Sequence, residues 1–224
     1  MAEISATMVK ELRERTGAGI MDCKVALQES GGDAEKAVDY IKKKGLAKAA
    51  KKAGAIAAEG VVHAYIHPGS RIGVLVEVNC QTDFVARSED FKSYVELVGL
   101  QIASMNAQYV RREEVPAADT AKQVEIFKAQ LEEEAKQSGK PRPAAAVEKI
   151  VAGKVDKWLA EACLDEQLSI TDQDKTIGAL ASELSAKIGE KISVRRFVRF
   201  ELGEGIDKKT SDLAAEVQAT LASS

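Results

Sequence analysis

Aromatic residues make up only 4% of this 224-residue sequence, which also holds just three cysteines and two histidines. With so few aromatic side chains, a hydrophobic core has to be built from Ala, Val, Leu and Ile, as is usual in helix-rich proteins. An aromatic side chain at the surface would therefore stand out. Hydrophobic residues still account for 45% of the chain, enough for one ordinary domain and a small second module.

Cysteine and histidine are too sparse for the common metal and disulfide sites. Cys23, Cys80 and Cys163 are odd in number and include no CxxC pair, so neither a disulfide framework nor a zinc site is indicated. His63 and His67 fall on an expected strand, where four residues span about 13 Å. One zinc ion with ligands at about 2 Å cannot join them. We therefore expect no metal ion and no cofactor.

Long apolar runs are missing as well. The N-terminus, MAEISATMVKELRERTG, lacks the apolar centre of a signal peptide. No segment approaches the roughly 20 apolar residues that are needed to cross a bilayer. The sequence therefore predicts a cytoplasmic protein without membrane contact.

Positive charge is concentrated near the start of the chain. Residues 1–58 contain eleven Lys or Arg and eight Asp or Glu, although the whole chain has a net charge of −3. Six of these lysines lie in KKKGLAKAAKK, residues 42–52. This run has no interleaved aromatics for base stacking, and the sequence pI is about 5.6. The pattern favours a solvated helix face and no direct nucleic-acid contact; docking on nucleic acid is the alternative.

Apolar spacing divides the chain into four regions and predicts an α+β fold. Residues 1–45 are predicted to form a three-helix module, whose third helix ends at Gly45. Residues 46–59 are rich in Ala and Lys and are predicted to be a helical linker. An α+β core with a small antiparallel sheet is expected over residues 60–205. A C-terminal helix is expected within residues 206–224.

The second helix of the module, near residues 20–29, has apolar residues on two sides. The inward residues are assigned as Ile20, Cys23, Ala26 and Leu27. Met21 and Val25, four residues apart, then form a small apolar patch on a different side. Since three short helices bury little surface, the module is expected to be marginal alone and suited to docking.

Beyond residue 59 the apolar period changes from near four to two. GVVHAYIH at 60–67 and RIGVLVEVNC at 71–80 are separated by PGS, which predicts a β-hairpin with one buried face. KISVRRFVRFEL at 191–202 predicts another strand. Helices between them complete the expected core.

NCQTDFVARSEDF, residues 79–91, places a large aromatic between the hairpin and a helix. Ser88 is a natural N-cap, so the helix is expected to start there and residues 82–87 to form a separate turn that displays Phe84. In the alternative, an unbroken helix puts Phe84 seven residues before Phe91, in phase with the apolar stripe, as a core anchor.

The carboxylates of this stretch do not predict a catalytic site. Asp83, Glu89 and Asp90 could act as acid and base, but no nucleophile or oxyanion donor is nearby, and a helix start explains the last two. GAGIMD at 17–22 follows a helix instead of a strand, so it lacks the context of a dinucleotide site. We predict no catalytic residues and a protein that acts by binding; a generic helical protein-binding module and a metabolic enzyme are the alternatives.

Five ordered segments together resemble the bacterial elongation factor Ts family. They are MVKELRERTGAGIMDCKVAL (8–27), AAKKAGAIAAEG (49–60), VNCQTDFVAR (78–87), QSGKP (137–141) and VRFELGEGI (198–206). The resemblance covers nearly the whole chain. Because only one core hairpin is present, the chain is similar to the short form of the family, which acts as a homodimer.

The resemblance implies a ubiquitin-associated-like N-terminal module, an α+β core, and a guanine nucleotide exchange factor for elongation factor Tu. In the family, a TDF element wedges into the partner's G domain, disturbs its Mg²⁺ and phosphate region, and lets GDP leave. The matching partner-binding residues are Thr82, Asp83, Phe84, Val85, Arg13, Ile20, Met21, Lys24 and His67.

Two of these residues test the resemblance against the apolar pattern. Met21 lies off the inward stripe and matches a partner contact, so both arguments agree. Ile20 matches a partner contact but is assigned inward.

His67 matches a hairpin histidine that contacts the partner's third domain in long members. A homodimer could therefore present Phe84 from one subunit and His67 from the other to one GTPase.

Overall fold

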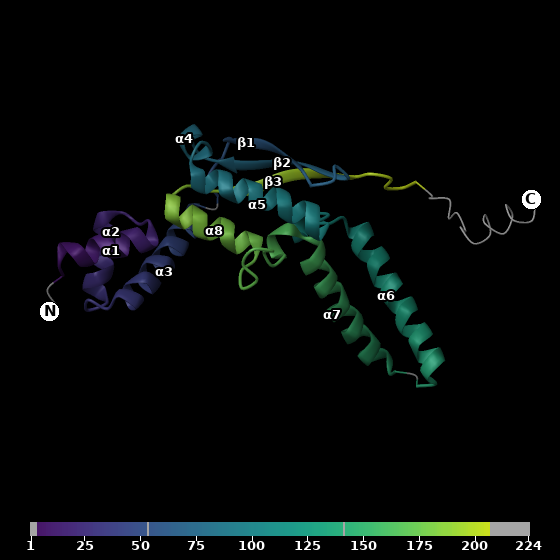
Figure 1. Cartoon of the computed structure of the whole chain (residues 1–224). Coiled ribbons are helices and arrows are strands. Elements are labelled where there is room, and N and C mark those ends of the chain that lie inside the picture. Colours follow the sequence, from purple (N-terminus) through teal and green to yellow (C-terminus); the bar gives the residue numbers. More distant parts are fainter. Residues whose placement is uncertain (1–3, 53, 141, 207–224) are drawn as a thin grey trace, which may run out of the picture.

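The computed structural model describes residues 4–52, 54–140 and 142–206 (Figure 1). The C-terminal helix expected within residues 206–224 lies, except for Ile206, outside this range. In the described ranges, the chain combines helices with a small antiparallel sheet, so the predicted α+β class is confirmed. None of the helices in these ranges is long and apolar enough to span a bilayer.

Three helices form the N-terminal part. They are α1 (Ala6–Thr16), α2 (Ile20–Glu29) and α3 (Ala34–Lys52). Ser5 caps α1 by accepting a hydrogen bond from the Met8 N–H, and Gly17 ends it at a φ of 66°, which glycine adopts without strain. The three helices enclose a small hydrophobic cluster of Leu12, Cys23, Ala26, Leu27 and Ala37.

α3 is longer than the sequence predicts, and the predicted helix end at Gly45 is wrong. The helix continues to Lys52 and includes the first residues of the predicted linker. A Cβ at Gly45 would come within 2.9 Å of the Ala186 Cβ on α8 (Ile177–Ile188). Gly45 therefore serves a close helix crossing instead of a helix end, because glycine leaves room for α8.

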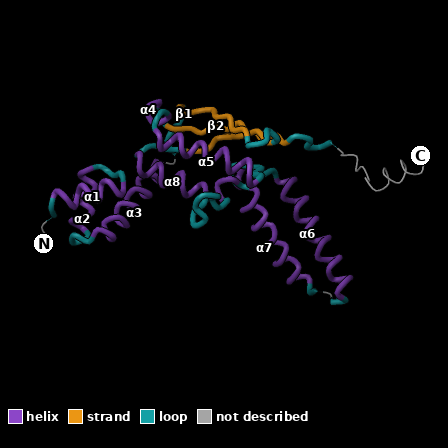
Figure 2. The backbone as a smooth tube through the Cα atoms, in the orientation of Figure 1, coloured by secondary structure: helices purple, strands orange, loops and turns teal. Residues whose placement is uncertain are grey.

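The predicted hairpin is confirmed and belongs to a three-stranded antiparallel sheet. The strands are β1 (Glu59–Ile66), β2 (Ile72–Cys80) and β3 (Ser193–Glu201), in the order β1-β2-β3. Val74, Val76 and Val78 of β2 are buried, as the alternation predicts. β3 pairs with β2 although more than a hundred residues separate them, so the sheet holds the two ends of the core together (Figure 2).

α5 (Glu89–Met105) lies along the inner face of the sheet, and α8 packs beside it (Figure 1). Ser88 caps α5, as predicted. Phe91, Val98 and Ile102 of α5 are fully buried in the cluster that also contains the β2 valines. This cluster is separate from that of the N-terminal helices.

The remaining helices form a hairpin that projects away from the sheet (Figures 1 and 2). Its helices are α6 (Ala117–Ser138) and α7 (Ala144–Ala162), with the short 3-10 helices η1 (Arg112–Glu114) and η2 (Leu164–Glu166) at the base. Gly139, with a φ of 65°, ends α6. The division into regions 1–45, 46–59 and 60–205 stays a prediction.

Candidate partner-binding surface

Phe84 lies on a four-residue helix, α4 (Asp83–Ala86), between β2 and α5 (Figure 1). Its side chain is 81% exposed, whereas Phe91, seven residues later, is fully buried. Ser88 accepts a hydrogen bond from the Phe91 N–H at 3.4 Å and so begins α5 as a new helix. The alternative in which Phe84 anchors the core is therefore wrong. The turn predicted at 82–87 contains this short helix.

The neighbours of Phe84 hold the short helix. The Thr82 hydroxyl caps α4 by accepting a hydrogen bond from the Val85 N–H at 3.5 Å. Arg87 Nη2 lies 2.6 Å from an Asp83 oxygen, one turn away on the surface. Val85, which the sequence groups with the partner-binding residues, is buried in the core cluster. Its side chain therefore supports α4 from beneath while Phe84 points outward.

A second group of predicted partner-binding residues lies on α1 and α2. Met21 is 70% exposed and Ile20 is 58% exposed. Arg13 on α1 and Lys24 on α2 are exposed too. The inward assignment of Ile20 is wrong, because Ile20 is the first residue of α2 and burial on this helix begins one turn later, at Cys23. The start of α2 thus presents two apolar side chains to solvent.

His67 lies at the other end of the hairpin from Phe84. Its backbone N–H donates to the Ile72 carbonyl at 2.9 Å, and its Nδ1 lies 3.2 Å from the Tyr65 hydroxyl. β2 runs between the two sites, and its eight steps from Ile72 to Cys80 span roughly 26 Å at about 3.3 Å each. Phe84 and His67 are therefore not brought together within one chain.

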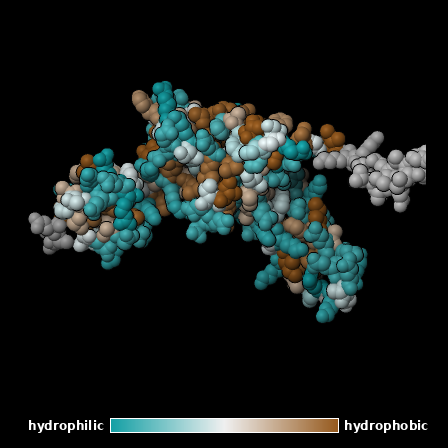
Figure 3. Space-filling view, viewed as in Figure 1, coloured by the Kyte–Doolittle hydropathy of each residue, from teal (hydrophilic) through white to brown (hydrophobic). Residues whose placement is uncertain are grey.

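The outer face of the sheet is apolar, although the predicted hairpin has only one buried face. In the strand register, Leu75 of β2 lies between Ala64 of β1 and Val198 of β3. Its exposed large hydrophobic residues are Val62, Ile66, Leu75, Val198 and Phe200, which we call the outer sheet face. Figure 3 shows hydrophobic residues along the upper side of the molecule, where the strands lie. The alternation within VRRFVRFEL was the available sequence signal.

One carboxylate stands among these apolar side chains. Glu77 of β2 lies 2.8 Å from Arg195 Nη1 and 2.7 Å from Arg196 Nε on β3. Hydrogen bonds from Arg195 and Arg196 lower the pKa of Glu77 from 4.5 to about 2. The carboxylate is therefore ionised at neutral pH and ties β3 to β2 across the outer side of the sheet.

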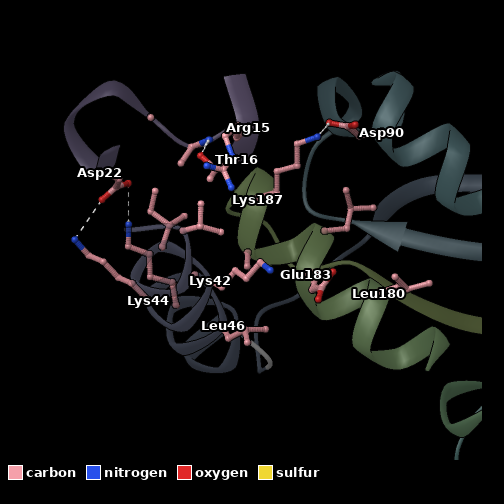
Figure 4. A pocket seen from close by; sticks show the side chains of 18 of the residues that line it. Arg15, Thr16, Asp22, Lys42, Lys44, Leu46, Asp90, Leu180, Glu183 and Lys187 are labelled. Carbon is pink, nitrogen blue, oxygen red and sulfur yellow. Dashed lines mark hydrogen bonds and ion pairs between the residues drawn. The ribbon is translucent and has the colours of Figure 1, made fainter. Parts of the chain in front are cut away.

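Residues of α3, the α1–α2 loop, α5 and α8 line a cleft of about 520 Å³ (Figure 4). Its walls combine apolar side chains with several charged groups. Asp22 lies 3.3 Å from both Lys44 and Lys48, and Lys187 lies 2.8 Å from Asp90. The first two pairs join α2 to α3 and the third joins α8 to α5, so these charges are already paired within each wall of the cleft. No cluster of metal-ligating side chains occurs in the part of the chain that the structure describes.

One residue beside the candidate site is not indicated by the sequence. Glu190, in the loop between α8 and β3, forms hydrogen bonds with the segment that precedes α4. It lies 108 residues from Thr82, which it contacts. No local spacing or composition marks such a residue, since only the pairing of β3 with β2 brings it there.

Known proteins resemble this chain along most of its length. A family model described as "Elongation factor TS" matches residues 28–204. Elongation factor Ts of Desulforamulus reducens is 58% identical over 221 residues, and that of Myxococcus xanthus is 57% identical over 221 residues, each alignment covering 99% of both chains. Elongation factor Ts of Carboxydothermus hydrogenoformans is 56% identical over 218 residues, covering 97% of this chain and 98% of the relative. The chain therefore belongs to the elongation factor Ts family.

Proposed function

We propose that this protein is a guanine nucleotide exchange factor that binds elongation factor Tu in the cytoplasm and returns it to the GTP form during translation elongation. Membership of the elongation factor Ts family supports this role. The exposure of Phe84 carries the mechanism, because a chain poor in aromatics displays this one on a capped helix beside its sheet. Asp83 and Phe84 insert near the Mg²⁺ and phosphate site of the partner, and GDP leaves.

Exchange of this kind requires no catalytic residue. The factor binds the nucleotide-free GTPase more tightly than the GDP-bound form, so by linkage it weakens GDP binding by the same factor. Burying one phenylalanine contributes roughly 1.5 to 3 kcal/mol, which corresponds to about a ten- to a hundredfold change in affinity. Phe84 alone is therefore one contributor, and other surfaces must bind the partner as well.

The N-terminal patch is the second contact surface that we propose. Ile20 and Met21 are exposed apolar side chains at the start of α2, and the exposed cations Arg13 and Lys24 belong to the same pair of helices. Apolar anchors with charged residues around them are typical of protein interfaces and not of nucleic-acid sites. This patch therefore adds affinity for the same GTPase.

We further propose that two copies of the chain form a homodimer through the outer sheet face. Five large apolar side chains share that face, and a small sheet needs a second layer to bury them. Phe84 and His67 lie at opposite ends of β2, and a twofold axis would let one subunit present Phe84 and the other present His67 to the same GTPase. The partner then contacts Phe84 of one subunit and His67 of the other.

Release of a fluorescent GDP from elongation factor Tu, followed after adding this protein and excess unlabelled GDP, tests the exchange role. An exchange factor increases the rate of release in proportion to its concentration until the GTPase is saturated. A protein that merely binds leaves the rate unchanged, and this outcome would rule out the proposed function. The Phe84→Ala variant then tests whether the exposed phenylalanine is responsible.

A further inference from the structure

The segment between β2 and α4 is held by a single distant carboxylate. One oxygen of Glu190, Oε2, accepts hydrogen bonds from the N–H groups of Gln81 at 3.1 Å and Thr82 at 3.0 Å. The other oxygen, Oε1, accepts a hydrogen bond from the Thr82 hydroxyl at 2.7 Å. Three donors of two consecutive residues therefore converge on Glu190.

Two further hydrogen bonds hold the same segment, one from the loop that contains Glu190 and one from the end of β2. The Gln81 side-chain oxygen accepts a hydrogen bond from the Lys191 N–H at 3.1 Å. The Cys80 thiol donates to the Thr82 carbonyl at 3.1 Å. The backbone before α4 is thus fixed by the 190–191 loop on one side and by the end of β2 on the other.

Thr82 transmits this attachment to the helix that carries Phe84. Its hydroxyl donates to Glu190 and at the same time accepts from the Val85 N–H, so the same oxygen that Glu190 orients is the cap of α4. A helix of four residues is too short to be stable by itself, because nucleation costs more than its few hydrogen bonds return. The geometry of α4 therefore depends on what holds its first turn.

The loop that carries Glu190 and Lys191 is itself attached to the last residue of α3 and to Ala55, which follows that helix. The Lys52 ammonium group donates to the Gly189 carbonyl, and the Lys191 ammonium group donates to the Ala55 carbonyl at 3.1 Å. Gly189 ends α8 in the left-handed region, with a φ of 83°, which directs the chain toward Glu190. Glu190 thus projects from a fixed support.

We infer that Glu190 is a positioning residue for the exchange reaction, which holds α4 so that Phe84 is presented in one orientation before the GTPase arrives. This inference rests on the proposed function. Charge-assisted hydrogen bonds to backbone N–H groups are among the stronger ones in proteins. Fixing the binding element beforehand removes an ordering cost that the complex would otherwise carry.

Two substitutions of Glu190 distinguish the effect of its hydrogen bonds from the effect of its side-chain size. Glu190→Ala removes all three acceptor contacts. Glu190→Gln keeps one carbonyl oxygen for the Gln81 and Thr82 N–H groups and is expected to restore part of the effect. Glu96→Ala, which truncates an exposed glutamate on α5, is the matched control.

Amide hydrogen exchange of the free protein tests the attachment without any partner. In Glu190→Ala the amides of Gln81, Thr82 and Val85 should exchange about tenfold faster, while those of β2 and α5 stay protected. Thermal unfolding monitored in parallel confirms that the fold is retained. Unchanged protection at Gln81 and Thr82 would overturn the inference, whether or not the protein catalyses exchange.

GDP release from elongation factor Tu tests the consequence. We expect Glu190→Ala to reduce the rate about tenfold, the equivalent of one charge-assisted hydrogen bond, with Glu190→Gln in between and Glu96→Ala unchanged. In a Phe84→Ala background the same substitution should change the rate by less than about twofold, because the side chain that it positions is gone.

The single and double substitutions together distinguish the positioning role of Glu190 from the proposed mechanism through Phe84. Equal losses from Glu190→Ala in both backgrounds would overturn the positioning role, since Glu190 would then act independently of Phe84. Exchange that depends on Phe84 but not on Glu190 would overturn the positioning role alone. Exchange that is insensitive to Phe84→Ala would overturn the proposed mechanism itself.

Discussion

Gly45 on α3 and Ala186 on α8 lie so close that a Cβ on Gly45 would stand 2.9 Å from the Cβ of Ala186. Protein interiors do not tolerate such an approach without movement. The crossing of α3 over α8 therefore depends on a glycine in the middle of a long helix. The N-terminal helices are therefore attached to the core in two ways, by the chain itself and by the packing of α3 against α8.

Gly45→Ala should weaken this crossing. Alanine favours the helix by about 1 kcal/mol, but overpacking costs about 1 to 3 kcal/mol, so we expect a net loss of about 1 kcal/mol. Denaturant unfolding measures the loss. Combining it with Ala186→Gly should cost less than the sum of the two changes. A Cβ at Gly153 on α7 would meet no atom within 4 Å, so Gly153→Ala, the control, should be neutral or stabilising. A Gly45→Ala variant that is more stable than the wild type would contradict the close crossing of α3 and α8.

Phe84→Ala should separate function from stability. Because Phe84 is exposed, the free energy of unfolding should change by less than about 1 kcal/mol, while GDP release falls about ten- to a hundredfold. Phe91→Ala is the matched control, since the same truncation of a fully buried ring should cost about 3 to 5 kcal/mol. A comparable loss of stability in both variants would restore the core-anchor interpretation of Phe84.

These two phenylalanines show what the sequence could predict. Ser88 carried the information, because a cap residue separates two helices that the apolar period alone would join. The hairpin and α5 were predictable for the same reason: alternation and caps are local. Gly45 was mispredicted because a glycine that ends a helix and one that admits another helix are identical in sequence. Ile20 was mispredicted because periodicity ignores where a helix begins.

Met21→Ala should weaken partner binding without affecting the fold. Met21 is exposed on α2, so stability should change by less than about 0.5 kcal/mol, while the concentration of factor for half-maximal GDP release rises. Leu27→Ala on the same helix removes a fully buried side chain and should cost about 2 to 5 kcal/mol. A Met21→Ala protein with an unaltered half-maximal concentration would argue against a contact at this patch.

Glu77→Gln should show a characteristic pH dependence. The folded pKa of Glu77 is lowered from 4.5 to about 2, so its ionised form stabilises the fold above pH 4.5, and this stabilisation is lost as the pH falls toward 2. The melting temperature of the variant should therefore be lower than that of the wild type at pH 7, and the two melting temperatures should become equal near pH 2. Glu96→Gln, an exposed substitution on α5, should leave the melting temperature at pH 7 unchanged. If the difference in melting temperature between Glu77→Gln and the wild type did not change with pH, the lowered pKa of Glu77 would be contradicted.

Leu75→Glu should disrupt the proposed homodimer. Leu75 lies at the centre of the outer sheet face, and a carboxylate there would be buried without a partner if two such faces pack together. Sedimentation at micromolar concentration should show a dimer for the wild type and a monomer for the variant. Ile126→Glu on α6 places the same change on an exposed apolar residue outside the sheet and should leave the dimer intact. A wild-type monomer that still catalyses exchange would overturn the dimer proposal.

Mixing two slow variants tests whether Phe84 and His67 act from different subunits. A Phe84→Ala homodimer and a His67→Ala homodimer each lack one residue at both composite sites. Their heterodimer places both substitutions in one composite site and leaves the other intact, since β2 holds the two residues at opposite ends of each chain. GDP release should therefore recover on mixing, and adding Leu75→Glu to both variants should abolish the recovery. If the mixture stays as slow as its parents while dimers exchange subunits freely, the two residues do not form a shared site.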